Sequence, residues 1–506
     1  MKNLRLFILM SSVCYCLPNY SQQTFFKIYT TPMHERGFDA IETTSGDFII
    51  VGERAEDYLY EHFKGVAMKL NSTGELIDEL EVGDSIQNYR FTLINKLYGN
   101  ENRFLLIGSM DSISVTDSFA RLILYTCNDS LDILSQKRIL SMQNHTIYAW
   151  KDDIVNDSIL YILVEDHNLN FTPANQQLGI VKINMPYDSL NVYFTGGNTT
   201  TRIAQDVLYL KSKNILNIFY FGSLLDLSGA TRIIQLTDSL TVLGSKICNV
   251  DLISTFCATY FSDSTYLLTG TGKSEFNYGY ENHILSYLMN DQDDTLHRLE
   301  YLNNPDTILY AGFGTNTIIN DGSIFITGIY NVEDPWGIPW LTTPTWIQIT
   351  KTDLDMNIIS QYFYGGDAEY LPYTIIPTED GGALVTGLVW EYNIPNNFQH
   401  DIFALKVNSE GILTSFQEHS AKKACEVIVY PNPGSEHLGI RSSCQIFGSK
   451  FTMYDLTGKV LFESEIEDSQ IEINTSDLPN GTYIWQVVNT NRMIDSGKWI
   501  KEFSNY

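Results

Sequence analysis

Short runs in which hydrophobic and polar residues alternate, separated by turn-forming residues, fill most of the chain. The first clear set spans 38–43, 48–52, 65–70 and 75–80. The connections at 45–47 and 71–74 are rich in Ser, Asn, Asp and Gly, which turns favour. Alternation with a period of two is typical of half-buried strands. The pattern therefore predicts a four-stranded antiparallel unit, whose strands we call a, b, c and d in chain order.

The same unit recurs along the chain at intervals of roughly 50 to 60 residues. The end of strand b can be followed at Gly52, Gly108, Val164, Gly222, Gly270, Gly328 and Gly387. Seven copies fill residues 22–418, which predicts an all-β fold with a seven-bladed β-propeller; six or eight blades are the alternatives. Residues 25–29 resemble a strand d with no a, b or c before it, so we expect them to complete the last blade and close the ring.

The start of the chain reads as a secretory signal peptide over residues 1–21. Lys2 and Arg5 form the charged start of the signal. The apolar run at 4–13 is too short to cross a bilayer comfortably. Lipidation of Cys14 is the alternative, although Ser-Ser-Val before it makes a poor lipidation signal. Elsewhere we expect no membrane-spanning segment.

The segment 426–506, after a linker at 419–425, is a series of short alternating strands with Pro-Asn-Pro, Thr-Gly and Asn-Gly turns, which predicts a small β-sandwich. Its motif residues are Tyr430, Pro431, Asn432, Pro433, Asp455, Gly458, Leu478, Pro479, Gly481, Tyr483 and Lys498. Cys425 and Cys444 are placed either to form a disulfide or to be buried separately.

The order and spacing of these motifs resemble the type A sorting domain of the type IX secretion system of Bacteroidetes-like bacteria. The resemblance implies export across the outer membrane, a secreted or cell-surface location, and the type IX secretion machinery as a partner. It implies nothing about the activity of the propeller.

Composition excludes some classes of ligand. Of 506 residues, 44% are hydrophobic, enough for a sizeable core, whereas 60 acidic and 32 basic residues give a net charge of −28. A protein with this much negative charge repels phosphate backbones and anionic lipid. We therefore expect no nucleic-acid partner. The chain has no P-loop, GxSxG or HExxH motif, so we expect no cofactor and no metal and assign no catalytic residue.

Aromatic residues in the loops between strands b and c are the candidate binding residues. They are Tyr58, Tyr60, Tyr278, Tyr280, Trp336, Trp340, Trp390 and Tyr392. Flat rings beside Asn, Asp and Glu suit sugars, and rigid aromatic side chains also anchor protein partners. The alternative is that long loops fold over the channel and bury these rings.

We therefore expect a non-catalytic module that binds an extracellular glycan or a surface protein. One alternative is a propeller glycoside hydrolase or lyase that uses carboxylates in the channel. The other is a structural scaffold at the cell surface.

Overall fold

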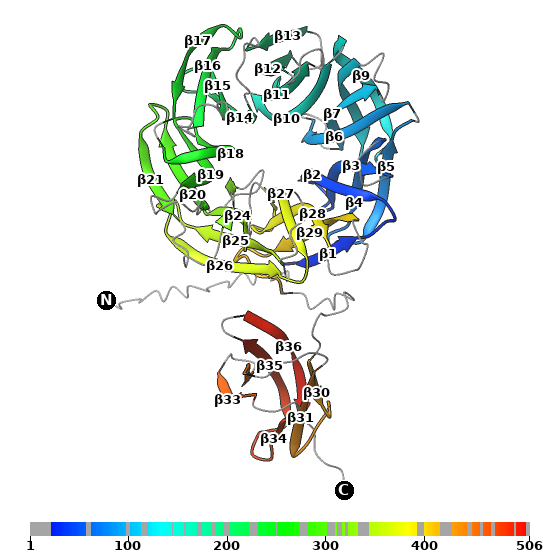
Figure 1. Cartoon of the computed structure of the whole chain (residues 1–506), viewed down its shortest axis with the longest axis vertical. Helices are drawn as coiled ribbons and strands as arrows, with labels where there is room; N and C mark the ends of the chain where they lie inside the picture. The colour runs from blue at the N-terminus through cyan, green and yellow to red at the C-terminus, as the bar shows by residue number, and fades with distance from the viewer. Residues whose placement is uncertain are drawn as a thin grey trace, which may run out of the picture. The chain divides into compact units, whose positions relative to one another are not determined.

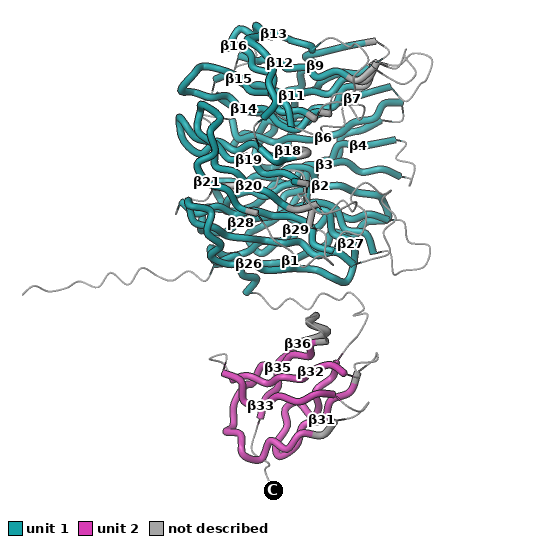
Figure 2. Tube along the Cα trace, turned by 60° about the vertical axis from the view of Figure 1, so that its left-hand side comes forward, with its two compact units in different colours: residues 1–417 teal, residues 418–506 magenta. Residues whose placement is uncertain are grey.

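The computed structural model divides into two compact units, Met1–Gln417 and Glu418–Tyr506 (Figure 2). It describes residues 22–56, 62–84, 86–97, 102–112, 119–143, 145–155, 158–168, 175–184, 189–195, 203–221, 231–248, 250–273, 282–300, 309–310, 316–318, 322–331, 344–391, 399–414, 427–442, 448–455, 459–466, 471–489 and 492–501. Every regular element in these ranges is a β-strand. The described part of the chain contains no helix with the length and apolar character that a membrane crossing requires.

In the first unit, the described strands form seven antiparallel sheets arranged as the blades of a ring (Figure 1). Blade 1 is β2 (His34–Glu42), β3 (Phe48–Ala55), β4 (Phe63–Leu70) and β5 (Leu76–Val82). Blade 2 is β6 (Gln87–Lys96), β7 (Arg103–Ser112), β8 (Phe119–Asn128) and β9 (Ile133–Gln143). Blade 3 is β10 (His145–Val155), β11 (Ile159–Asn168), β12 (Asn175–Asn184) and β13 (Ser189–Phe194). The all-β propeller predicted from the repeat is confirmed.

The remaining blades follow the same order, innermost strand first. Blade 4 is β14 (Ile203–Leu210), β15 (Ile215–Phe221), β16 (Thr231–Thr237) and β17 (Val242–Ile247). Blade 5 is β18 (Leu252–Ser262), β19 (Thr265–Lys273), β20 (Asn282–Asn290) and β21 (Thr295–Glu300). Blade 6 has two short inner pieces, β22 (Leu309–Tyr310) and β23 (Asn316–Ile318), followed by β24 (Ile324–Tyr330), β25 (Trp346–Thr352) and β26 (Ile358–Gly365). Blade 7 contains β27 (Glu369–Pro377), β28 (Ala383–Trp390) and β29 (His400–Val407).

The ring is closed by the first described strand. β1 (Phe25–Tyr29) pairs antiparallel with β29, from Phe25 opposite Lys406 to Tyr29 opposite Ile402. Blade 7 therefore takes its outermost strand from the other end of the repeat array, as the sequence predicts. Closure of this kind joins the first and last blades without an additional domain.

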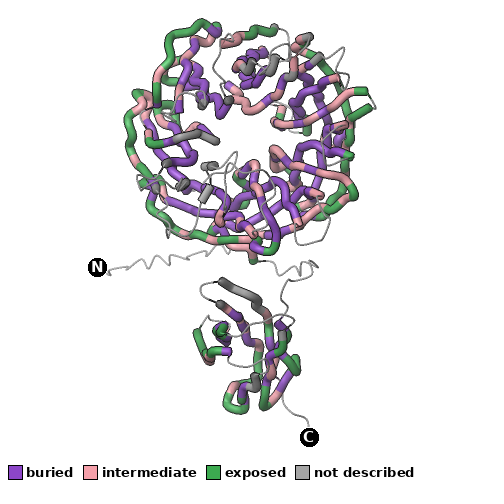
Figure 3. The backbone as a smooth tube through the Cα atoms, in the orientation of Figure 1, coloured by how far each residue is buried: buried purple, intermediate pink, exposed green. Residues whose placement is uncertain are grey.

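Burial follows the position of a strand within its blade (Figure 3). Every residue of β3 is buried, whereas β5 alternates between exposed and half-buried residues. The middle strands are covered on both faces by neighbouring blades, so they are apolar almost throughout. The outer strands face water on one side, which explains why the alternating pattern is clearest there.

The second unit contains two facing sheets. One sheet has the order β30 (Val427–Tyr430), β31 (His437–Ser442) and β34 (Ile471–Asn474). The other has the order β33 (Val460–Glu465), β32 (Lys450–Tyr454), β35 (Gly481–Asn489) and β36 (Arg492–Lys501). A single core that includes Phe451, Trp485 and Trp499 lies between them, so this unit is the small β-sandwich that the sequence predicts.

Candidate functional site

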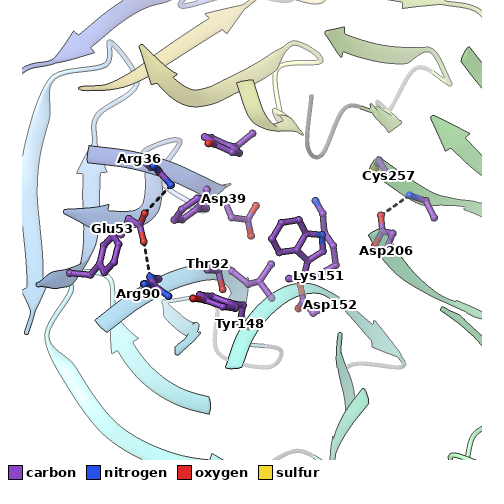
Figure 4. Close-up of a pocket in the computed structure, with 17 residues that line it drawn as sticks. Arg36, Asp39, Glu53, Arg90, Thr92, Tyr148, Lys151, Asp152, Asp206 and Cys257 are labelled. Atoms are coloured by element: carbon purple, nitrogen blue, oxygen red, sulfur yellow. Dashed lines mark hydrogen bonds and ion pairs between the residues drawn. The ribbon is translucent and has the colours of Figure 1, made fainter. Parts of the chain in front are cut away.

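A cavity of about 640 Å³ opens at the centre of the ring (Figure 4). Most of its wall comes from innermost strands, namely β2, β6, β10, β14, β18 and β27, with Glu53 and Phe63 added from β3 and β4. Five aromatic side chains line it: Phe38, Phe63, Tyr148, Trp150 and Tyr373. Seven charged side chains also line it: Arg36, Asp39, Glu53, Arg90, Lys151, Asp152 and Asp206.

A β-bulge in each of these six inner strands shapes the wall. The pairing shifts between Gly37 and Asp39, Phe91 and Leu93, Ala149 and Lys151, Ala204 and Asp206, Thr255 and Cys257, and Pro372 and Thr374. An extra residue in one strand bends it and redirects side chains. Four of the extra residues, Phe38, Thr92, Trp150 and Tyr373, line the cavity. The bulges therefore place three of its five aromatic rings.

The repeated glycine at the end of strand b lies opposite these bulges. A Cβ atom on Gly52 would lie 1.9 Å from the backbone oxygen of Arg36, and one on Gly108 would lie 1.7 Å from that of Arg90. Gly387 stands in the same relation to the Leu371 oxygen, at 2.0 Å. Glycine is needed here because the bulged strand brings its backbone too close for any side chain.

Arg90 is held between two rings at one part of the wall. Its guanidinium carbon lies 4.1 Å from the centre of the Phe63 ring and 4.8 Å from that of Tyr148. Glu53 is 2% exposed and forms ion pairs with both arginines. Its Oε2 lies 3.0 Å from Arg90 Nε, and its Oε1 lies 3.5 Å from Arg36 Nη1. These contacts fix both rings and both arginines by charge and cation–π attraction.

The inner carboxylates connect neighbouring blades. Asp39 Oδ2 accepts the backbone N–H of Ile94 at 3.0 Å, and Asp206 Oδ2 accepts that of Ala258 at 2.6 Å. Asp152 Oδ2 accepts Asn95 Nδ2 at 2.5 Å. Each carboxylate is thus oriented by the adjacent blade while its side chain faces the cavity.

The protonation states of these groups depend on their surroundings. Burial raises the pKa of Asp39 to about 6, that of Asp152 to about 7 and that of Asp206 to about 6. Burial acts to lower the pKa of Lys151, but the carboxylates of Asp206, Asp39 and Asp152 contribute to a larger opposing effect that leaves it raised. Lys151 is therefore cationic at neutral pH, and Asp152 is partly protonated.

Of the eight aromatic residues proposed from the sequence, Trp390 lies within the described residues. It ends β28, is 5% exposed and packs edge-on against His400, with ring centres 6.0 Å apart. Trp390 is therefore buried, as the alternative interpretation of these aromatic residues expects, and its role in binding stays a prediction. Tyr58, Tyr60, Tyr278, Tyr280, Trp336, Trp340 and Tyr392 lie outside the described residues.

Sequence reasoning missed the residues that line the cavity. Phe38, Trp150 and Tyr373 fall in strand a, where an alternating pattern reads them as ordinary core or surface positions. For Phe38 and Tyr373 the repeated glycine of strand b was the available signal, because it marks a close backbone approach and hence a bulge in the strand opposite; for Trp150 the corresponding residue is Val164.

In the second unit, the described motif residues converge on β36. Asn432 Nδ2 donates to the Lys498 carbonyl at 2.7 Å, and its Oδ1 accepts the Ile500 N–H at 2.9 Å. Trp499 Nε1 donates to the Pro431 carbonyl at 2.7 Å. The Pro-Asn-Pro turn is thus fastened to the last strand.

Two further motif regions meet the same strand. Lys501 Nζ donates to the carbonyl oxygens of Thr475, Ser476 and Leu478 at 2.6, 2.9 and 2.6 Å. Gly481 pairs with Lys501 and Tyr483 with Trp499, and the Tyr483 hydroxyl donates to the Pro479 carbonyl. Pro433 and Tyr430 are exposed beside this junction. Asp455 Oδ1 accepts the Lys459 N–H at 3.1 Å across a turn, and Gly458 within that turn lies outside the described residues.

Residues 428–502 match the family of secretion system C-terminal sorting domains. The sorting domain is the signal for type IX secretion, so the chain is exported, either to the cell surface or into the medium. The motif contacts around Trp499 and Lys501 are accordingly the framework of the sorting domain.

Comparisons of the whole chain add only a similarity of fold. A comparison with curated proteins found no match. Similar solved structures include an unknown-function protein from Dyadobacter fermentans, 9% identical, covering 76% of this chain and 98% of that one with a TM-score of 0.47. The β-propeller domain of the Trilobed protease from Pyrococcus furiosus is 10% identical. The similarity covers 69% of this chain and 93% of the protease domain, with a TM-score of 0.30. An alpha-L-arabinanase of Penicillium chrysogenum, complexed with arabinobiose, is 13% identical. The similarity covers 77% of this chain and 98% of the arabinanase chain, with a TM-score of 0.37.

Proposed function

We propose that the propeller is a non-catalytic binding module that holds an extracellular glycan in its central cavity. The observation that carries this proposal is the composition of the wall: five aromatic rings and seven charged side chains surround about 640 Å³. The signal peptide proposed for residues 1–21 and the sorting domain would deliver the module to the cell exterior.

The chemistry of the wall suits a polyhydroxylated ligand. Aromatic faces cover the apolar C–H surfaces of a sugar ring, and charged groups donate to or accept from its hydroxyls. Phe38 and Tyr373 meet edge to face with ring centres 5.3 Å apart, so neither ring is free to collapse into the cavity. Rings that are held in place lose little entropy when a ligand binds, which favours affinity.

A retention assay with the full chain on a panel of immobilised polysaccharides tests the proposal. We expect Trp150→Ala and Tyr373→Ala to abolish retention of any glycan that the natural chain binds. Phe363→Ala is the matched control, because Phe363 is a 45% exposed ring on the outer strand β26. If both cavity variants fold, as judged by thermal melts, and still retain the glycan, then the cavity is not the binding site.

The loop aromatic residues remain part of the proposal as further contacts, for a glycan or for a surface protein. Trp336 and Trp340 come between β24 and β25 in the sequence and lie outside the described residues. Loss of retention in Trp336→Ala combined with Trp340→Ala, with the cavity variants unaffected, would move the binding site from the cavity to the loops.

Glycoside hydrolysis is the second candidate function, and one observation favours it. Asp39 and Asp152 line one cavity, and burial raises their pKa values to about 6 and about 7. A carboxyl group that is partly protonated near neutral pH is suited to general acid catalysis. Measuring reducing ends in the same assay separates the candidates: their release by the natural chain, and its loss in Asp152→Asn, would assign hydrolysis.

A further inference from the structure

Three consecutive residues of one strand, Trp150, Lys151 and Asp152 of β10, line the central cavity. In a regular strand, successive side chains point to opposite faces, so three in a row would not share a cavity. The bulge between Ala149 and Lys151 interrupts this alternation at Trp150, and all three residues line the cavity. The cavity wall therefore carries an aromatic ring, an ammonium group and a carboxylate next to one another.

Lys151 is available to a ligand. Its side chain reaches into the cavity (Figure 4), and within the described part of the chain its Nζ has no hydrogen bond or ion pair. The surrounding carboxylates are engaged elsewhere: Asp39 by Ile94 and Asp206 by Ala258. A half-buried ammonium without a hydrogen-bond partner is costly unless a ligand or water accepts from it.

Asp152 has acceptor capacity to spare. Its Oδ2 accepts from Asn95 at 2.5 Å, and no described residue donates to its Oδ1. A carboxylate can accept two or more hydrogen bonds, so Asp152 is able to take a further donor from the cavity. Lys151 and Asp152 thus offer one donor group and one acceptor side by side.

The mixed charges in the cavity offer little net attraction to a charged ligand. A ligand ammonium would be attracted by Asp39, Asp152 and Asp206 but repelled by Lys151, and a ligand carboxylate would be attracted by Lys151 but repelled by the three carboxylates. Like charges in a partly desolvated site repel strongly. Hydroxyl groups escape both repulsions, because each can accept from Lys151 or donate to Asp152.

We infer that Trp150, Lys151 and Asp152 form a subsite for an uncharged sugar residue with adjacent hydroxyls. The sugar ring lies against the indole of Trp150, one hydroxyl oxygen accepts from Lys151 Nζ, and the neighbouring hydroxyl donates to Asp152. This inference rests on the proposed function, that the cavity binds a glycan. It adds the chemical class of the ligand and the residues that recognise it.

Titration of the full chain with three kinds of oligosaccharide tests the inference: neutral gluco-, xylo-, arabino-, galacto- and manno-oligosaccharides, oligogalacturonate, and chitosan oligomers. We expect at least one neutral series to bind and the two charged series to bind at least tenfold more weakly. Lys151→Met and Asp152→Asn should each weaken the neutral ligand by about tenfold to a hundredfold, the usual worth of a hydrogen bond to a charged group. Lys96→Met, at an exposed lysine that ends β6, is the matched control and should leave affinity unchanged.

The outcomes distinguish the inference from the proposed function. Binding of only oligogalacturonate or chitosan, lost in Trp150→Ala, would keep the cavity as a glycan site and overturn the neutral subsite. Unchanged affinity of Lys151→Met for a neutral ligand would also overturn the subsite. If none of the three series binds, the proposed function fails and the inference fails with it.

Folding of the variants is checked independently. Lys151 has no hydrogen bond to lose among the described residues, so Lys151→Met should keep the melting temperature of the natural chain, and Lys151→Gln is the second variant if it does not. Tryptophan fluorescence gives a direct readout of the indole. A change in fluorescence on adding the neutral ligand should disappear in Trp150→Phe, and its persistence there would place the sugar away from β10.

Discussion

Removing the two phenylalanines of β1 should open the ring. Phe25 is fully buried and packs against blade 1, with its ring centre 6.0 Å from that of Phe48. Phe26 points the other way, against Tyr370 and Phe403 of blade 7, at 5.6 and 6.2 Å. Because strand side chains alternate, this one strand attaches the end of the repeat array to its beginning.

The size of the effect follows from burial. Replacing a buried Phe by Ala costs about 3–5 kcal/mol, so Phe25→Ala with Phe26→Ala costs roughly 6–10 kcal/mol if the two add. A cooperative unit of about 400 residues has an unfolding entropy near 0.8 kcal/mol per kelvin. The expected fall in melting temperature is therefore about 4–6 °C for one substitution and about 7–12 °C for both.

Scanning calorimetry of the full chain at a fixed scan rate measures this shift, with the sorting domain as an internal reference that should melt unchanged. Ile77→Ala is the control, because Ile77 is 51% exposed on the outer strand β5 and should move the melt very little. A double variant whose propeller melts within about 2 °C of the natural chain would refute the argument that β1 fastens the ring.

Three further predictions concern the bulge, the cavity carboxylates and the sorting domain. Gly108→Ala should lower the melting temperature by several degrees, because its Cβ would lie 1.7 Å from the Arg90 oxygen, whereas Gly244→Ala, whose Cβ would meet nothing within 4 Å, should leave the melting temperature nearly unchanged. Burial raises the pKa of Asp152 to about 7 from 3.8, so the folded state binds its proton more tightly than the unfolded state. Stability should then fall as the pH rises from about 4 to about 7, and Asp152→Asn should flatten the dependence of the melting temperature on pH. Lys501→Met removes the hydrogen bonds that the ammonium group donates to the carbonyl oxygens of Thr475, Ser476 and Leu478, of which the Thr475 oxygen keeps the Leu478 N–H at 3.0 Å. It should destabilise the sorting domain by about 1.5–3 kcal/mol, seen as earlier melting of that unit and intracellular retention of the chain in a type IX-competent host.

Opposing titrations limit how far acid stabilises the fold. Burial lowers the pKa of His400 from 6.5 to about 3. The unfolded state therefore binds this proton more tightly, and the folded state loses stability as the pH falls below about 6.5. Burial raises the pKa values of Glu35 and Glu369 to about 7, and these groups act in the same direction as Asp152. The comparison with Asp152→Asn isolates the contribution of Asp152, because every other titrating group is common to both proteins.

The architecture of the chain could be predicted because it depends on local patterns that repeat. Turn residues and alternation recur along the repeat, and six of the seven copies have a glycine at the end of strand b. In a closed ring, the isolated strand at 25–29 can pair only with the last blade. The sorting domain could be predicted because its turns, such as that at Pro431 to Pro433, are short and keep their order along the chain.

The candidate site could not be predicted, because its residues come together only when the ring closes. Asp39, Asp152 and Asp206 are far apart in sequence and lie in an acidic chain where carboxylates give little contrast. Trp390 shows a second limit: the sequence left open whether its ring is exposed or buried, and β28 extends far enough to bury it. Whether a strand ends one residue earlier or later decides such a case, and hydrophobic patterns do not fix strand ends that closely.

Fold and site are coupled through the bulges of the inner strands. In blades 1, 2 and 7 the glycine that permits the close approach of the backbone is the residue that made the repeat visible, and the bulge opposite it directs Phe38 or Tyr373 into the cavity in blades 1 and 7. A blade that lacked the bulge would regain regular alternation, and in β10 the side chains of Trp150, Lys151 and Asp152 would no longer face the same space. Blade 3 carries Val164 where other blades carry glycine, yet it keeps the bulge between Ala149 and Lys151. Glycine therefore accommodates the close approach where the strands are tightest but is not what creates the bulge, so the inner strand itself sets the shape of the cavity.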